Sequence, residues 1–279
     1  MALVTMDQLL RNARTKGIGA GAFNVGNLEM VKGAVQAAEE TQTPIILQIA
    51  EVRLWHSPLN YIGPMMVQAA KDASVDIAVH FDHGRTATAI QQALELGFTS
   101  VMYDGSGESF EENIRKTQAV VQLARYYGAS VEAELGRVGG SEDGTERHAA
   151  HYTDVSQAVQ FCRETGIDAL AIAIGNAHGA YKQAPALAFD VLQEIREQVE
   201  IPLVLHGGSG ITDEEFQRLI RTGITKVNIA TASFNAVANA VAQHIRTDSD
   251  HSYFTISEAM VRGAYQNILH HINVFRCGT

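Results

Sequence analysis

Residues 76–103 read DIAVHFDHGRTATAIQQALELGFTSVMY and contain two β-rich runs on either side of a helical segment. The runs are Asp76–Phe81 and Thr99–Tyr103, and the stretch Thr86–Leu96 between them carries apolar residues at helical spacing. Gly97 follows the helical stretch, where a glycine supplies the left-handed conformation that often ends a helix. A strand, a helix and a second strand in this order indicate a parallel βαβ unit.

The same alternation continues along the whole chain. We expect eight strands, at Gly19–Val25, Pro44–Ala50, Asp76–Phe81, Thr99–Tyr103, Ser130–Leu135, Asp168–Ile174, Pro202–His206 and Thr225–Ile229. Strict alternation with helical segments favours a parallel sheet covered by helices, and eight uninterrupted units favour a closed barrel. No GxGxxG motif follows the first strand, which removes the usual dinucleotide signal. We therefore predict an α/β protein in which residues 1–279 form a single (β/α)8 TIM-barrel domain.

Composition limits the classes of function. Hydrophobic residues make up 46% of the chain, enough for a sizeable core, and the net charge is −10 without a basic run, so neither nucleic acid nor an anionic membrane is expected as a partner. Met1–Gly17 has the pattern of a surface helix that begins with a Thr5–Gln8 capping box, and no apolar stretch is long enough to span a membrane. The two cysteines, Cys162 and Cys277, give no metal-binding spacing. We expect a cytoplasmic protein.

Polar residues gather at the predicted carboxyl ends of the strands, where barrels of this kind carry their chemistry. The segments are His80–Gly84, Asp104–Ser106, Glu132 with Glu134, Gly175–Gly179, His206–Gly210 and Asn228–Thr231. Three histidines, His83, His178 and His206, follow three different strands. A single histidine at such a place is well explained as a hydrogen-bonded structural residue, but three at equivalent positions predict a catalytic Zn²⁺ site with an open coordination position.

The other histidines lie in predicted helices, loops or the C-terminal tail. We place His56, His148, His151, His244, His251, His270 and His271 at the surface. His80 is ambiguous, because it shares a strand face with Asp82. Asp82 itself is placed either for proton transfer or for orienting its neighbour His83.

Two further groups complete the predicted site. The glycine-rich segments after the sixth and seventh strands, with the end of the eighth, indicate phosphate binding, and Ser209 and Thr231 add hydroxyl donors. Glu132 and Glu134 lie on one strand face between apolar neighbours, where a cation has to offset their repulsion.

Together these motifs resemble the class II, zinc-dependent ketose-bisphosphate aldolases, the family of the fructose- and tagatose-bisphosphate aldolases. The resemblance covers nearly the whole chain. Its most specific segments are His80–Gly84, Val131–Gly136, Gly139–Gly144, Gly175–Gly179, His206–Gly210 and Asn228–Thr231. It implies reversible cleavage of a ketose 1-phosphate or ketose 1,6-bisphosphate into dihydroxyacetone phosphate and an aldehyde, through a metal-stabilised enediolate.

The resemblance also implies roles for individual residues. His83, His178 and His206 would hold the zinc, Asp82 would exchange the proton of the C4 hydroxyl, and Glu142 would exchange a proton on the dihydroxyacetone phosphate carbon. The substrate phosphate and its neighbouring oxygens would be bound by Gly179, Gly207, Gly208, Ser209, Asn228, Ile229, Ala230 and Thr231. Asp104 and Glu134 would form an alternative metal position, and carbonyls near Ala177 and Gly179 would hold a monovalent cation, Na⁺ or K⁺. A homodimer or homotetramer is expected on the same ground.

Two departures from the family concern the distal end of the sugar. Members that cleave 1,6-bisphosphates commonly carry a histidine where Gly107 follows Ser106, and an Asp-Pro-Arg near the C-terminal helices. The corresponding stretch here, Asp248–Tyr253, has neither proline nor arginine, although Arg246 and Arg262 lie nearby. We therefore expect an intact triose-phosphate half and a distal half that accepts a longer or acidic ketose 1-phosphate.

Three alternatives remain open from the sequence. A Schiff-base aldolase needs a lysine, and the candidate is Lys226 at the start of the eighth strand. A metal-dependent hydrolase on the same barrel usually begins with His-x-His, whereas the first strand reads Ala22–Val25. A non-catalytic sugar-phosphate-binding or aldolase-stabilising subunit is the third, and Asp82 together with three metal ligands argues against it.

Overall fold

Eight parallel strands close into a barrel in the order β1-β10-β9-β7-β5-β4-β3-β2. The computed structural model describes residues 2–140, 151–179 and 185–278. The barrel strands are β1 (Ala20–Asn24), β2 (Ile45–Ala50), β3 (Ile77–Gly84), β4 (Ser100–Tyr103), β5 (Ser130–Leu135), β7 (Ala169–Ile172), β9 (Leu203–Leu205) and β10 (Ile224–Ile229). Each coincides with one of the eight predicted runs, so the α/β barrel prediction is confirmed.

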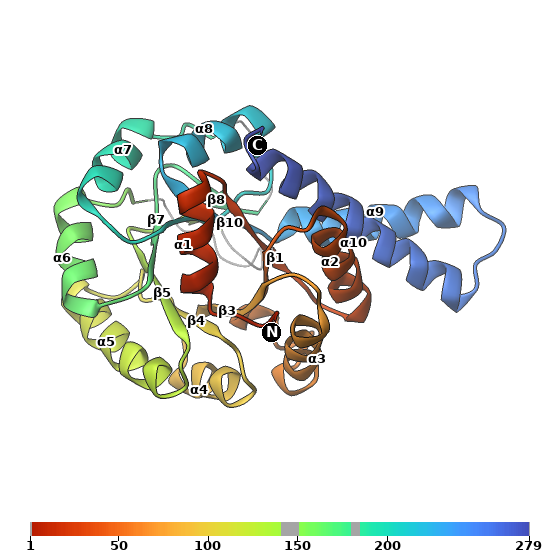
Figure 1. Ribbon diagram of the computed structural model, residues 1–279, viewed down its shortest axis with the longest axis horizontal. Coiled ribbons are helices and arrows are strands. Elements are labelled where there is room, and N and C mark those ends of the chain that lie inside the picture. Colours follow the sequence, from red (N-terminus) through yellow and green to blue (C-terminus); the bar gives the residue numbers. More distant parts are fainter. Residues whose placement is uncertain (1, 141–150, 180–184, 279) are drawn as a thin grey trace.

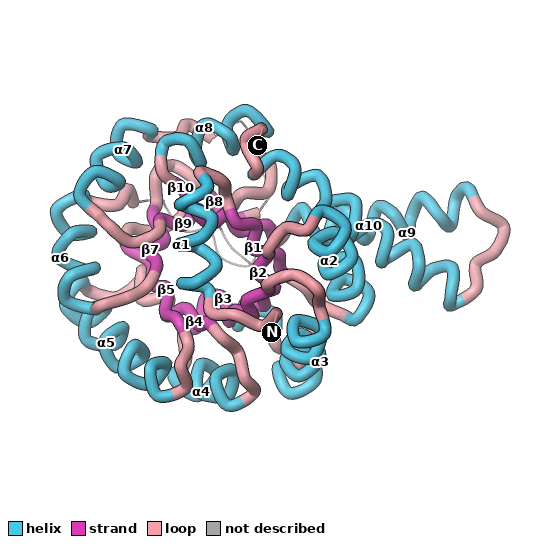
Figure 2. Tube along the Cα trace, viewed as in Figure 1, coloured by secondary structure: helices cyan, strands magenta, loops and turns pink. Residues whose placement is uncertain are grey.

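Helices surround this ring of strands (Figure 2). They are α1 (Met6–Lys16), α2 (Leu28–Thr41), the short 3₁₀ helix η1 (Glu51–Arg53), α3 (Leu59–Asp72), α4 (Ala87–Glu95), α5 (Phe110–Tyr126), α6 (Val155–Thr165), α7 (Phe189–Gln198), α8 (Asp213–Thr222), α9 (Thr231–Thr247) and α10 (Tyr253–Phe275). Helix α1 begins as predicted, with the Thr5 side chain accepting a hydrogen bond from the backbone N–H of Gln8. In the part of the chain that the structure describes, no helix is long and apolar enough to cross a membrane.

The barrel interior divides into an apolar half and a polar half. Inward-facing residues alternate along each strand, and those near the amino ends are small or apolar, as at Ala22, Ile46 and Val204. Helix α1 lies across this end of the barrel (Figure 1). Its Met6 and Leu10 are fully buried there, and each such burial stabilises the fold by roughly 2 kcal/mol.

The polar half lies at the carboxyl ends of the strands. Its buried members are Asn24, Gln48, His80, Asp82, Glu132, Glu134, His206, Lys226 and Asn228. With one end closed by α1, the chemistry of the barrel is confined to the opposite end.

Helices α9 and α10 form a hairpin that extends away from the barrel (Figure 1), which the sequence did not predict. Helix α10 approaches the backbones of both α9 and α2 closely. A Cβ atom at Gly263 would lie 2.8 Å from the carbonyl oxygen of Ala236 in α9, and one at Gly33 would lie 2.6 Å from that of Val261 in α10. Both glycines therefore allow the helix backbones to come together.

The prediction that seven histidines lie at the surface is wrong for two of them. His244 and His271 are only 7% and 8% exposed, whereas His56, His151, His251 and His270 are exposed and His148 lies outside the described residues. His271 donates from Nδ1 to the Asn267 carbonyl at 2.7 Å and packs against Phe216 and Phe275. Burial lowers its pKa to about 4. Both histidines belong to α9 and α10, which we call the arm helices and whose packing the sequence did not reveal.

Candidate active site

Three amide side chains hold Asp82 in the polar half of the barrel. Asn228 donates to Oδ1 at 3.1 Å, and Asn24 and Gln48 donate to Oδ2 at 3.3 Å each. These donors come from β10, β1 and β2, so three strands orient one carboxylate that is only 1% exposed. Asp82 is thus fixed as a hydrogen-bond acceptor at the catalytic end of the barrel.

His83 reaches the same interior through an irregularity in β3. Consecutive residues of a regular strand point to opposite faces, so Asp82 and His83 would diverge. The β3–β4 pairing shifts register between Phe81 and Gly84, and His83 has a φ of 46°. A non-glycine residue in this region costs roughly 1–2 kcal/mol, and strain of this kind concentrates at functional sites. The bulge therefore places two neighbouring side chains in one site.

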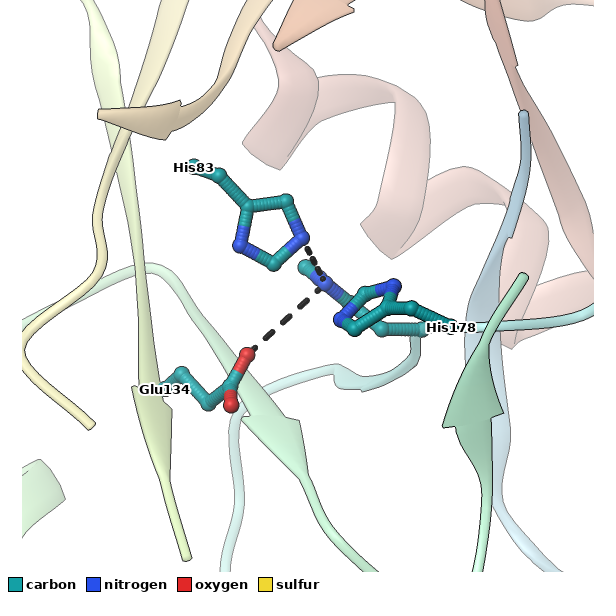
Figure 3. A group of neighbouring side chains, drawn as sticks. His83, Glu134 and His178 are labelled. Carbon is teal, nitrogen blue, oxygen red and sulfur yellow. Dashed lines mark hydrogen bonds and ion pairs between the residues drawn. The ribbon is translucent and has the colours of Figure 1, made fainter. Parts of the chain in front are cut away.

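A cluster of four potential ligands lies beside Asp82. One ligand atom from each of His83, Glu134, His178 and His206 falls within 4.8 Å of all the others. Figure 3 shows His83, Glu134 and His178 directed toward one another from different elements of the barrel. The structure thus brings the three predicted histidines together and adds Glu134 to them.

Carboxylates on the outer side of the cluster determine which ring nitrogens face inward. His83 Nδ1 lies 2.8 Å from Asp104 Oδ2, and His206 Nε2 lies 2.7 Å from Glu132 Oε1. If each of these nitrogens donates to its carboxylate, the lone pairs of His83 Nε2 and His206 Nδ1 face each other at 2.8 Å. Two facing acceptors repel, and a bound cation turns the repulsion into coordination. The donor set therefore fits a divalent metal.

Glu134 gives a second indication of a cation. Its Oε2 is buried without a hydrogen-bond partner and lies 3.8 Å from His206 Nδ1. Burial, followed by the negative charge of Asp104, raises the Glu134 pKa above its ordinary value. A metal in the cluster reverses this balance, because a cation stabilises the ionised carboxylate.

The two outer carboxylates titrate in the opposite direction. Burial works against the charge of Asp104, but hydrogen bonds from His83 and Ser106 outweigh it and hold the Asp104 pKa well below its usual range. Burial is also outweighed at Glu132, where the charge of Lys226 and the hydrogen bond from His206 lower the pKa. Both groups are therefore carboxylates that orient the histidines. Asp104 accepts from Ser106 and His83, and the alternative metal position at Asp104 and Glu134 stays a prediction.

A two-stranded sheet positions His178. Strands β6 (Gly139–Gly140) and β8 (Ala177–His178) pair in parallel, with Gly140 opposite His178. A Cβ atom at Gly140 would run into the His178 carbonyl oxygen, so this pairing requires glycine. Strands of two residues are too short to give a periodic signal in the sequence, so they were not predicted.

The predicted phosphate-binding segments meet where α9 begins. Gly208 donates from its backbone N–H to the Asn228 carbonyl at 3.2 Å, and Ser209 Oγ accepts from the Ala232 N–H at 2.9 Å. These contacts join the ends of β9 and β10 at the first turn of α9, which starts at Thr231. Gly207 has a φ of 67° and packs against the Ala177 carbonyl, which brings β8 to the same place. Backbone N–H groups at a helix start attract anions, so this junction suits a phosphate.

Lys226 does not offer a nucleophile for a Schiff base. It is the third residue of β10, fully buried, and its Nζ lies 2.8 Å from Glu132 Oε2. The same Nζ donates to Asn228 Oδ1 at 2.7 Å. The sequence placed Lys226 at a strand start but gave no sign of its partners.

Glu142, the second predicted catalytic residue, lies outside the described residues. Comparison with known proteins decides the class. The family model for fructose-bisphosphate aldolase class-II matches residues 4–278. This chain belongs to the class II fructose-bisphosphate aldolase family. It is a ketose-phosphate aldolase on a TIM barrel.

Known relatives of this class II aldolase are named after different substrates. The chain is 40% identical over 258 residues to a probable fructose-bisphosphate aldolase of Bacillus subtilis strain 168, covering 90% of this chain and 89% of that protein. It is 37% identical to the sulfofructosephosphate aldolase of Alkalicoccus urumqiensis, covering 94% and 93%. Among solved structures, the YdjI aldolase of Escherichia coli K12 superimposes with a TM-score of 0.87 at 35% identity, covering 98% and 97%. The family thus determines the reaction class but not the sugar.

Proposed function

We propose that this aldolase reversibly cleaves a ketose 1-phosphate or ketose 1,6-bisphosphate into dihydroxyacetone phosphate and an aldehyde, with Zn²⁺ held by His83, His178 and His206. The observation that carries the proposal is the cluster of inward-facing histidine nitrogens beside the amide-bound carboxylate of Asp82. When bound, the metal supplies Lewis-acid polarisation of the ketone and stabilises the charge left on the triose half.

Asp82 moves the proton in the cleavage direction. Its carboxylate takes the proton of the C4 hydroxyl, the O–H electrons form the aldehyde C=O bond, and the C3–C4 bond breaks with its electron pair left on C3. Each Asp82 oxygen already accepts an amide hydrogen bond, which fixes the direction from which the hydroxyl approaches. In the condensation direction the same oxygen returns the proton.

Other parts of the proposal rest on the family resemblance. Glu142 exchanges a C3 proton of the dihydroxyacetone phosphate half, and carbonyls near Ala177 and Gly179 hold Na⁺ or K⁺ beside the phosphate. The phosphate is bound by Gly179, Gly207, Gly208, Ser209, Asn228, Ile229, Ala230 and Thr231. The chain acts as one cytoplasmic domain within a homodimer or homotetramer.

For the distal end of the sugar we propose an acidic or extended ketose 1-phosphate. Arg246 and Arg262 are exposed on the arm helices. Arg53 instead lies three residues after Ala50, the β2 residue that pairs with Asp82, with its guanidinium over the Phe234 ring at 5.4 Å. This half-buried cation at the catalytic end supports an anionic distal group. The aldolase names of the relatives give the hydrolase and non-catalytic alternatives no support.

The experiment starts with the half-reaction, which needs no choice of aldehyde. The protein is incubated with dihydroxyacetone phosphate in D₂O, and loss of the C3 proton is followed by NMR with and without a chelator. We expect chelator-sensitive exchange that is reduced in Glu142→Ala and retained in Glu146→Ala, the matched glutamate of the same segment. Absence of exchange in folded, zinc-loaded protein would contradict the proposed triose site.

A further inference from the structure

A continuous line of buried polar contacts joins the proton-transfer carboxylate to the metal cluster. Asp82 binds Asn228, Asn228 accepts from Lys226, Lys226 pairs with Glu132, and Glu132 binds His206. Of these five side chains, Asn228 is 5% exposed and the other four are 0–1% exposed. Lys226 stands at the centre of the line and is joined to His206 through Glu132 and to Asp82 through Asn228.

Stability does not account for a lysine in this position. Burying an ion pair removes two charges from water, and apolar residues of similar volume often serve a fold equally well. The amino half of the same barrel is filled with small and apolar side chains. The role of the Lys226 ammonium group therefore has to be sought in the side chains that it contacts, Glu132 and Asn228.

We propose that Lys226 is a positioning residue that keeps Asp82 and His206 in working orientation through Asn228 and Glu132. This inference rests on the proposed function of these two residues.

On one side, Lys226 determines which way the Asn228 amide faces. Because Nζ donates to Asn228 Oδ1, the opposite end of the amide, Nδ2, donates to Asp82. Without the lysine the amide can rotate and present its oxygen to the carboxylate, where two acceptors repel. Asp82 then loses the donor that orients Oδ1.

On the other side, Lys226 holds the Glu132 carboxylate. Its Nζ lies 2.8 Å from Oε2, while Oε1 lies 2.7 Å from His206 Nε2. Nε2 of His80 is farther from Oε2, at 3.7 Å, and the ring is fixed by Nδ1 contacting Ser100 at 2.7 Å. Lys226 is therefore the close cationic partner of Glu132, and the orientation of Glu132 sets which nitrogen of His206 faces the metal.

The test compares Lys226→Met, which removes the donor, with Lys226→Gln, which keeps an uncharged N–H donor on a side chain one bond shorter. Val227→Ala is the control, because Val227 is the next residue, is fully buried and faces the outer core. Folding is checked by circular dichroism. Zn²⁺ affinity is measured on metal-free protein by competition with a chromogenic chelator, and kcat and KM are measured for fructose 1,6-bisphosphate and fructose 1-phosphate cleavage.

We expect Lys226→Met to weaken Zn²⁺ binding about tenfold, the lower end of the effect of losing a ligand's own outer partner, because Lys226 acts on His206 through Glu132. We expect kcat to fall about 100-fold with little change in KM, since misplacement by about 1 Å has this effect. Lys226→Gln should lie between Lys226→Met and the native protein, and Val227→Ala should lower Tm alone.

A folded Lys226→Met, or Lys226→Gln if the methionine variant does not fold, with native Zn²⁺ affinity and native kcat overturns the proposal. The affinity measurement needs no substrate. If the native protein cleaves neither sugar phosphate and exchanges no proton, the proposed function fails, and the Zn²⁺ comparison still decides whether Lys226 positions His206.

Discussion

Replacing Asp82 by asparagine separates the two halves of the reaction. The substitution keeps the shape of the side chain but turns one oxygen into an NH₂ group, so at least one of the three surrounding amides then faces a donor instead of an acceptor. The neighbours cannot rotate without loss, because Asn24 Oδ1 accepts from Gln48 at 2.7 Å and Asn228 Oδ1 accepts from Lys226. One buried unsatisfied donor costs about 1–3 kcal/mol.

The expected effect on catalysis is larger than the effect on stability. Asp82→Asn removes the group that takes the C4 hydroxyl proton, which should lower kcat for sugar-phosphate cleavage by about 10²–10⁴-fold. Exchange of the C3 proton of dihydroxyacetone phosphate uses the metal and Glu142 in the proposed mechanism, so it should persist. Tm should fall by a few degrees, as expected for a loss of about 1–3 kcal/mol in a chain of this size.

Both activities are measured on zinc-loaded protein, by the appearance of dihydroxyacetone phosphate and by NMR in D₂O. Asp190→Asn is the control, because Asp190 is exposed in the first turn of α7. Cleavage within about tenfold of the native rate would refute the role of Asp82 as the base. Exchange that falls in parallel with cleavage would show that the substitution damages the metal site instead.

Removal of metal by a chelator should abolish cleavage and Zn²⁺ should restore it, while His178→Ala should lower kcat by about 100-fold or more; native turnover in metal-free protein would contradict both expectations. Gly207→Ala forces a positive φ on alanine and a clash with the Ala177 carbonyl, so it should lower stability by at least about 1–2 kcal/mol and weaken Zn²⁺ binding. Gly17 also has a positive φ, 66°, but a Cβ atom there would have no neighbour within 4 Å. Gly17→Ala should therefore lower Tm only through the strain of the positive φ, and a Zn²⁺ titration should be unchanged. The pKa of His271 is about 4 in the folded protein and 6.5 in the unfolded chain, so the unfolded state binds more protons between these two pH values. The free energy of unfolding therefore falls by up to about 3 kcal/mol as the pH drops from 6.5 to 4. The Tm of His271→Leu should therefore fall less than that of the native protein between pH 6.5 and 4. An equal fall would show that His271 does not cause the loss of stability.

The arm formed by α9 and α10 shows where sequence patterns stopped being informative. Its helices contain apolar residues at helical spacing, but that spacing does not say which helix covers the barrel and which extends from it. His244 and His271 were assigned to the surface because polar residues in helices usually lie there. His271 packs against Phe216 of α8, a segment far away in sequence, and His244 contacts Asp250 and His251 in the connection between α9 and α10. Neither contact has a periodic signal in the sequence.

The sequence by itself determined the barrel and the list of polar residues at its catalytic end, because strand–helix alternation and glycine punctuation are local signals. It also placed His83, His178, His206 and Asp82 at strand ends that a closed barrel brings together. Only the tertiary structure decided that Glu134 joins the histidines and that Lys226 links Glu132 to Asn228. The physical reason is that hydrogen-bond partners and ligand orientation depend on distances across the barrel, and no spacing along the chain records them.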